Sequence, residues 1–222
     1  MTPPFALSLR LCQGPIDEII ACSAVLFDMD NTLLDSSICV QKTWRMWAAR
    51  HGLDAEAVLH LSHGRQNHET MRLVDPQLDN PVEHAFMVQA EETCVEGIVA
   101  VPGAAELLRQ LPPERWAVVT SAWRKLAELR LHCADLPTPR VFLTSDEIPR
   151  SKPHPDGYLA AAAQLGVEPA ACVVIEDAHA GIEAARAAGM RVIAITTTFP
   201  REQLGCQWCI DDFRSLSVNG LL

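Results

Sequence analysis

Short apolar runs alternate along the chain with longer segments in which alanine and leucine recur at helical spacing. The runs are typical of buried strands and the longer segments of amphipathic helices. The expected strands are residues 24–27, 116–119, 141–143, 172–175 and 192–195. The expected helices are residues 104–111, 122–133, 157–165 and 181–188. This alternation predicts an α/β fold, in which helices cover both faces of a parallel sheet and the ligand site lies beyond the carboxyl ends of the strands.

One segment, from residue 36 to about residue 99, contains no convincing strand. Its amphipathic stretches, which predict helices, are residues 38–51, 55–61 and 81–96. We therefore expect an all-helical cap domain, residues 36–101, inserted into a core formed by residues 1–35 and 102–222. Residues 1–20 are interpreted as a mobile or helical N-terminal extension of that core.

The composition narrows the choice of partners. Of the 222 residues, 49 % are hydrophobic and 21 % charged, which is ordinary for a globular enzyme, and the formal net charge is −10. An acidic chain repels polyanions, so we expect neither nucleic acid nor an anionic membrane as a partner. No apolar run approaches the roughly 18 residues of a membrane span. A small anionic substrate remains possible, provided that the chain supplies a local cation.

The eight cysteines are scattered, and several lie in apolar stretches, where a free cysteine acts as a small hydrophobic residue. Only Cys206 and Cys209 lie close together, and without a second pair at zinc spacing we expect no metal or redox function there. Residues 1–21 match a signal peptide poorly. We therefore expect a reducing, cytoplasmic location.

Two carboxylates follow the first expected strand. Asp28 and Asp30 are two positions apart, so in an extended segment they point the same way and share one pocket. Paired carboxylates repel each other unless a cation or a proton lies between them. The alternative is a turn, because aspartate, asparagine and threonine favour turns.

Polar residues also follow the next expected strands. The hydroxyls of Thr120 and Ser121 are candidates to bind an anionic oxygen, or alternatively cap the following helix. Lys152 lies beside Pro153, in a loop that a further proline also rigidifies, and would supply the local cation. The alternative interpretation is that Lys152 is an ordinary surface lysine.

An acidic pair, Glu176 and Asp177, follows the fourth expected strand. Hard oxygen ligands of this kind suit Mg²⁺, which keeps several waters and needs few protein carboxylates. The alternative is a helix cap before His179, a residue that we expect to be packed or exposed rather than a ligand.

Four motifs in this order, FDMDNTLLDS, VVTSA, SKPHPDGY and VVIEDAHAGIEAA, resemble those of the haloacid dehalogenase superfamily. The resemblance implies a Rossmann-like three-layer core and a Mg²⁺-dependent phosphatase. It implies that Asp28 is the nucleophile and Asp30 the general acid and base, while Thr120 and Lys152 hold the phosphoryl oxygens. It also implies a metal site made by Asp28, the Asp30 carbonyl and Asp177, with Glu176 acting directly or through water.

The inserted segment resembles the cap of bacterial sugar-phosphate phosphatases of this superfamily, through WAARHGL at residues 47–53 and HGRQ at residues 63–66. This resemblance implies that Gly64 and Arg65 reach the substrate, a sugar, sugar-alcohol or glycerol phosphate. Arg65 would bind hydroxyls or a second anion, or alternatively is a solvated helix charge. His63 and Gln66 are weaker candidates. We expect a monomer or a simple homo-oligomer.

Three other functions fit the sequence less well. A dehalogenase lacks the second carboxylate that Asp30 provides. A β-phosphoglucomutase shares all four motifs, but those mutases resemble each other in a histidine twelve positions after the nucleophile, where this chain has Val40. A non-enzymatic phospholigand-binding module would have lost a catalytic carboxylate or Lys152. One departure from the superfamily is Asn31, which stands where glycine is usual; asparagine tolerates a positive φ well, so we expect the site to be intact.

Overall fold

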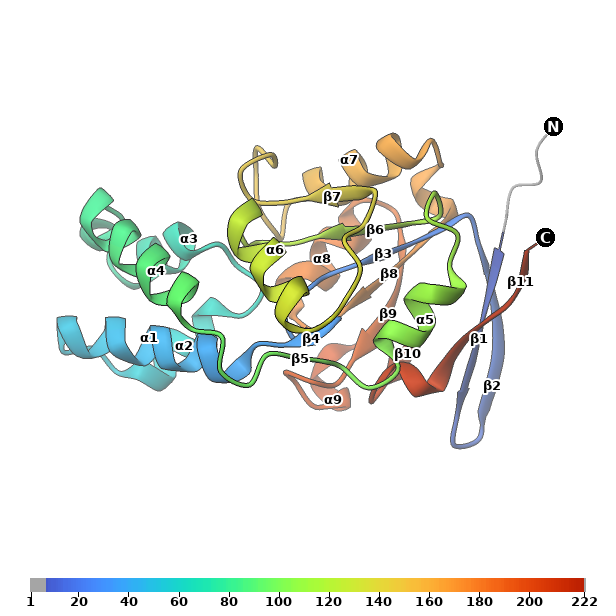
Figure 1. The fold of residues 1–222 in the computed structure, drawn as a ribbon, viewed down its shortest axis with the longest axis horizontal. Helices are drawn as coiled ribbons and strands as arrows, with labels where there is room; N and C mark the ends of the chain where they lie inside the picture. Colours follow the sequence, from blue (N-terminus) through green and yellow to red (C-terminus); the bar gives the residue numbers. More distant parts are fainter. Residues whose placement is uncertain (1–6, 222) are drawn as a thin grey trace.

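The computed structural model describes residues 7–221 and is built around a six-stranded parallel sheet with the order β10-β9-β8-β3-β6-β7 (Figure 1). Its strands are β3 (Ala24–Phe27), β6 (Trp116–Val119), β7 (Val141–Leu143), β8 (Cys172–Glu176), β9 (Arg191–Ile195) and β10 (Trp208–Ile210). The first five confirm the predicted strands, and the α/β fold class is likewise confirmed. The edge strand β10, only three residues long, was not predicted.

Helices cover both faces of this sheet, because alternate side chains of each strand point to opposite sides. Val25 and Phe27 of β3 pack with residues of α5 (Ala104–Gln110) and α6 (Arg124–Cys133). Ala24 and Leu26 pack instead with residues of α7 (Asp156–Leu165) and α8 (His179–Ala187), and the short α9 (Arg201–Leu204) joins this second cluster. Two buried layers thus hold the central strand, whose carboxyl end carries Asp28.

A helical insertion, which we define as α1 to α4, interrupts the chain between β4 (Leu34–Asp35) and β5 (Val99–Ala100), two short strands that pair antiparallel. The helices are α1 (Ser37–His51), α2 (Ala55–Ser62), α3 (Asn67–Val74) and α4 (Pro81–Thr93), with a 3₁₀ turn at Pro76–Leu78. They enclose a hydrophobic cluster of their own, which contains Trp44, Trp47, Val58, Met71 and Met87. The three helices predicted from the sequence are confirmed, whereas α3 lies where none was predicted.

A disulfide joins Cys39 of α1 to Cys94, directly after α4, with Cα atoms 5.5 Å apart. It links the two ends of the helical insertion. The interpretation of the cysteines as free hydrophobic side chains is therefore wrong for this pair.

The expectation of a mobile or helical N-terminal extension is wrong for residues 7–20, and residues 1–6 lie outside the described residues. β1 (Leu7–Gln13) and β2 (Ile16–Cys22) form a hairpin, and β1 also pairs with β11 (Leu216–Leu221) from the other end of the chain. Leu7, Leu9 and Leu11 are fully buried while Arg10 is exposed. Apart from Ser8, which is also buried, this is the period-two pattern of a strand with one buried face.

Within residues 7–221, no helix is long and apolar enough to cross a membrane. The cytoplasmic location stays a prediction.

Candidate active site

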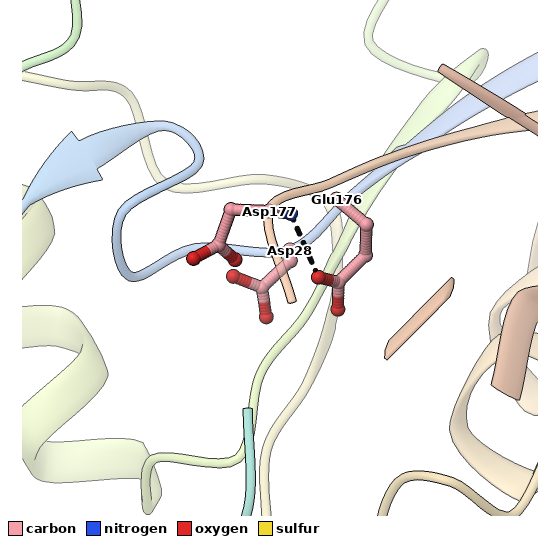
Figure 2. Close-up of side chains that lie close together, drawn as sticks. All are labelled: Asp28, Glu176 and Asp177. Atoms are coloured by element: carbon pink, nitrogen blue, oxygen red, sulfur yellow. Dashed lines mark hydrogen bonds between the residues drawn. The ribbon is translucent and has the colours of Figure 1, made fainter. Parts of the chain in front are cut away.

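The carboxyl ends of three adjacent strands bring the predicted polar residues together. Asp28 directly follows β3, Thr120 follows β6, and Glu176 and Asp177 lie at the end of β8. Figure 2 shows the side chains of Asp28, Glu176 and Asp177 side by side at this edge of the sheet. Carboxylate oxygens of these three residues lie within 4.8 Å of one another, so the cluster can hold a metal ion.

Lys152 reaches the same cluster from the loop before α7. Its side chain is 5 % exposed, which excludes the alternative of a surface lysine. The ammonium donates a hydrogen bond to Asp28 Oδ1 and another, at 2.7 Å, to Glu176 Oε1. Lys152 therefore provides the local cation that an anionic substrate requires.

Glu176 is fully buried, and its carboxylate is occupied by protein donors. Besides Lys152, the Tyr158 hydroxyl donates to Oε1 at 3.2 Å. The backbone N–H groups of Asp177 and Ala178 donate to Oε2 at 2.9 and 3.0 Å. Glu176 thus holds Lys152 in place and fixes the backbone at the start of α8.

Burial dominates the electrostatics of the cluster. It raises the pKa of Asp28 to about 7, against the opposing pull of the Lys152 ammonium. It also raises the pKa of Asp177 well above its usual range, with the charges of Glu176 and Asp28 adding to the effect. Burial disfavours the charge of Lys152, but Asp28 and Glu176 outweigh it and raise the pKa of this lysine. Three carboxylates share one ammonium, so the metal-free cluster keeps protons that a bound cation would displace.

Two threonines hold the Asp177 carboxylate. The Thr32 hydroxyl donates to Oδ1 at 3.2 Å, and the Thr198 hydroxyl donates to Oδ2. Neither threonine was among the predicted site residues. Thr198 lies shortly after β9, so the rule that polar residues at strand ends form the site would have found it.

Asp30 faces the same cavity but stands apart from the three-carboxylate cluster. Its Oδ1 accepts a hydrogen bond from Ser36 Oγ at 2.6 Å and forms an ion pair with Arg130 Nη1 at 2.9 Å. The next residue, Asn31, has φ 59°, and its side chain accepts a hydrogen bond from Ser37 Oγ. Asparagine therefore occupies a position that does require the left-handed conformation, where it is one of the better substitutes for glycine.

A cavity of about 300 Å³ lies between the sheet edge and the helical insertion. It contains most of the residues predicted for the site, namely Asp28, Asp30, Gly64, Arg65, Thr120, Ser121 and Asp177. Glu176 does not line this cavity. Lys152 lines a small neighbouring pocket instead, which shares Thr120 and Ser121 with the cavity. Two charged residues of the cavity wall, Glu91 and Arg130, were not predicted, because each resembles a solvated position of an amphipathic helix.

The hydroxyls of Thr120 and Ser121 do not cap the next helix, because α6 begins at Arg124 without a side-chain cap. Ser121 Oγ instead donates to the Gly64 carbonyl at 3.0 Å, which joins the core to the insertion. Gly64 has φ 74°, and a Cβ there would lie 3.0 Å from the Ala178 side chain, so this loop packs closely on the start of α8. Arg65 is half-buried and donates to the Leu61 carbonyl at 2.9 Å.

A family model described as haloacid dehalogenase-like hydrolase matches residues 22–189. The chain belongs to this family. It is 43 % identical to hexitol phosphatase A of Escherichia coli (strain K12) over 179 residues, which cover 78 % of this chain and 83 % of that protein. It is 33 % identical to glycerol-1-phosphate phosphohydrolase 1 of Saccharomyces cerevisiae over 211 residues, which cover 88 % of this chain and 84 % of that protein. The predicted resemblance is confirmed.

Solved structures agree with this membership. A hydrolase from Pseudomonas syringae superimposes with a TM-score of 0.76 and 25 % identity, covering 85 % of this chain and 93 % of that one. In the present chain, as predicted from its sequence, Asp28, Thr120 and Asp177 lie where parallel strands end.

Proposed function

We propose that the protein is a Mg²⁺-dependent phosphatase that hydrolyses a sugar, sugar-alcohol or glycerol phosphate through an aspartyl-phosphate on Asp28. The observation that carries the proposal is the buried Asp28 carboxylate, which contacts Lys152 on one side and faces a cavity beside Asp177 on the other. The predicted enzyme class, a phosphoric monoester hydrolase, is confirmed by the family and by relatives whose names describe phosphatases.

The residues present fit a magnesium site, because their ligand atoms are hard carboxylate oxygens and three carboxylates share a single ammonium. In this proposal the Asp28 and Asp177 carboxylates and the Asp30 backbone carbonyl would hold the ion. Glu176, whose oxygens accept protein hydrogen bonds, would act on it through water or through its charge alone. Bound Mg²⁺ would polarise the phosphoryl oxygens and neutralise developing charge.

The side chains then divide the chemistry between them. Asp28 attacks phosphorus, which forms the aspartyl-phosphate bond and breaks the bond to the leaving oxygen, while Asp30 protonates that oxygen. Asp30 next removes a proton from the water that attacks the intermediate, and this releases inorganic phosphate and frees Asp28. Thr120 and Lys152 hold the phosphoryl oxygens, and Ser121 fixes the Gly64 loop. Such positioning and charge stabilisation supply most of the catalysis in phosphoryl transfer.

In the same proposal the helical insertion, together with its flanking residues 36–101, acts as a cap on a core of residues 1–35 and 102–222. It would close over the substrate and exclude water while Asp28 is phosphorylated. Gly64 and Arg65 reach the cavity from this side, and Arg65 would contact the substrate hydroxyls. Small phosphate esters with hydroxyl groups are the substrates named for hexitol phosphatase A and glycerol-1-phosphate phosphohydrolase 1.

A phosphosugar mutase of the β-phosphoglucomutase type is less well supported than a phosphatase. Residue 40, where those mutases resemble each other in a histidine, is a valine in the cavity wall. Valine cannot take part in proton transfer, so hydrolysis is favoured.

The test is a screen of hexitol, hexose and glycerol phosphates with Mg²⁺, scored by release of inorganic phosphate. Asp28→Asn should abolish release from every substrate. The matched control is Asp211→Asn, because Asp211 also follows a strand of the sheet but is 70 % exposed and does not line the cavity. Full activity of Asp28→Asn, or isomerised sugar phosphate in place of free phosphate, would refute the proposal.

A further inference from the structure

A buried arginine lies between the core and the helical insertion. Arg130, on α6, is 3 % exposed and lines the cavity. Its guanidinium stands between two carboxylates, with Nη1 2.9 Å from Asp30 Oδ1 and Nη2 3.5 Å from Glu91 Oε1. Among the described residues, neither Nε nor Nη2 has a hydrogen-bond acceptor. A buried charge that is only partly hydrogen-bonded is costly to the fold, which makes Arg130 a candidate for a functional role.

The contacts of Asp30 are confined to one of its oxygens. Ser36 Oγ and Arg130 Nη1 both contact Oδ1. No donor in the described part of the chain bonds to Oδ2. Because Asp30 lines the cavity, Oδ2 is the oxygen left to exchange a proton with the substrate.

The second carboxylate belongs to the insertion. Glu91 lies on α4, is 4 % exposed, and accepts a hydrogen bond from Asn67 Nδ2 of α3 at 2.7 Å. The contacts of Glu91, Arg130 and Asp30 therefore form a continuous row from the insertion to Asp30. The position of α4 against α6 determines whether Arg130 has one carboxylate partner or two.

We propose that Arg130 is a positioning residue that couples the seating of the helical insertion to the orientation of Asp30. With Glu91 seated, the guanidinium is fixed between two carboxylates and holds Asp30 by Oδ1, so that Oδ2 is presented to the leaving oxygen. When α4 moves away, Arg130 loses one of its two partners and its hold on Asp30 loosens. Protonation of the leaving group is thereby restricted to the closed enzyme. This inference rests on the proposed function, in which Asp30 is the general acid.

The test compares leaving groups. p-Nitrophenolate departs without a proton, whereas sorbitol 6-phosphate and glycerol 1-phosphate release alkoxides that need one. The quantity measured is kcat/KM, which includes only steps up to formation of the aspartyl-phosphate. A positioned general acid accelerates the chemical step about 100-fold or more. We expect Arg130→Gln to lower kcat/KM for both alkyl phosphates about 100-fold and Glu91→Gln about 10-fold, with p-nitrophenyl phosphate changed less than about 3-fold.

Two further variants separate coupling from general damage. Glu92→Gln is the matched control, because Glu92 contacts Lys125 and Trp123 at the same junction of α4 and α6 but not Asp30, and it should leave all three substrates unchanged. Arg130→Lys keeps one charged donor for Asp30 and should recover part of the alkyl-phosphate activity. If Arg130→Gln fails to fold, the leaving-group comparison is made with Glu91→Gln instead, because that variant keeps the ion pair of Arg130 with Asp30.

The outcomes separate the inference from its alternatives. Equal losses for p-nitrophenyl phosphate and the alkyl phosphates would assign Arg130 a structural role and overturn the inference. A larger loss for sorbitol 6-phosphate than for glycerol 1-phosphate would make Arg130 a binder of substrate hydroxyls, and would also overturn it. A wild-type enzyme that releases phosphate from none of the three would instead refute the proposed function, and the inference with it.

Discussion

The Lys152 ammonium donates a hydrogen bond to the Asp28 carboxylate, although 124 positions separate the two residues in the chain. Both side chains are nine-tenths buried or more. The lysine comes from the loop before α7 and the aspartate from the end of β3, so only the parallel sheet brings them together. This pair places a fixed positive charge beside the proposed nucleophile.

Replacing Lys152 with methionine should remove activity and also destabilise the fold. Asp28 and Glu176 would remain buried without their common cation. Breaking a buried ion pair in this way lowers the free energy of unfolding by about 3–5 kcal/mol. Urea unfolding and phosphate release measure the two effects. Lys125→Met is the control, because Lys125 is 76 % exposed in its pair with Glu92, and such a pair contributes at most about 1 kcal/mol. A Lys152 variant as stable as the control would contradict this account.

The stability of the metal-free protein should depend on pH through Asp28. Its folded pKa of about 7 lies above the ordinary value of 3.8, so between these values the folded state binds a proton that the unfolded state has lost. The free energy of unfolding therefore falls as pH rises from about 4 to about 7. In chelator, Asp28→Asn should lose part of this decline relative to the wild type. Identical pH profiles of the two proteins, measured by urea unfolding, would show that burial does not raise the pKa of Asp28.

Removing divalent ions should abolish phosphatase activity, and Mg²⁺ should restore it and raise the melting temperature.

Thr198→Val should raise the Mg²⁺ concentration for half-maximal activity about 10- to 100-fold, because Thr198 orients the Asp177 carboxylate. Thr196→Val is the control, since the Thr196 hydroxyl bonds to the exposed Asp211. Undiminished turnover of the wild type in excess chelator would exclude the metal from the mechanism.

Features that a single short segment of sequence determines could be predicted, whereas features that depend on the pairing of distant segments could not. The five predicted sheet strands are short apolar runs, and Asp28, Thr120, Lys152 and Asp177 lie near strand or helix boundaries that can be recognised one by one. The sheet of β1, β2 and β11 joins the two ends of the described chain, and that pairing has no local signal. The alternation of Leu7, Leu9 and Leu11 is a local signal and does indicate a strand.

Arg130 and Glu91 illustrate what a single sequence hides. Each is a charged residue within a helix, a pattern typical of solvated surfaces, and each is buried only because α4 and α6 pack across the cavity. Their burial is a property of the assembled insertion and core. Thr198 is different, since its place after β9 was readable from the chain.

The close approach of Gly181 to Glu176 provides the last prediction. Gly181 lies inside α8, where alanine would ordinarily favour the helix by about 1 kcal/mol. A Cβ at this position, however, would lie 1.5 Å from Glu176 Oε1, the oxygen that accepts the hydrogen bonds of Lys152 and Tyr158. Gly181→Ala should therefore push the carboxylate aside, free Lys152 from its second anchor, and lower kcat more than tenfold despite the better helix propensity.

The control for this substitution is Gly166→Ala, in which the added Cβ meets nothing within 4 Å. Gly166 has φ 67°, so alanine there is strained and should cost roughly 1 kcal/mol of stability while kcat stays unchanged. Steady-state kinetics and thermal unfolding of both variants distinguish an effect on the site from an effect on the backbone. A Gly181→Ala enzyme with wild-type kcat would mean that Lys152 does not depend on Glu176 for its position.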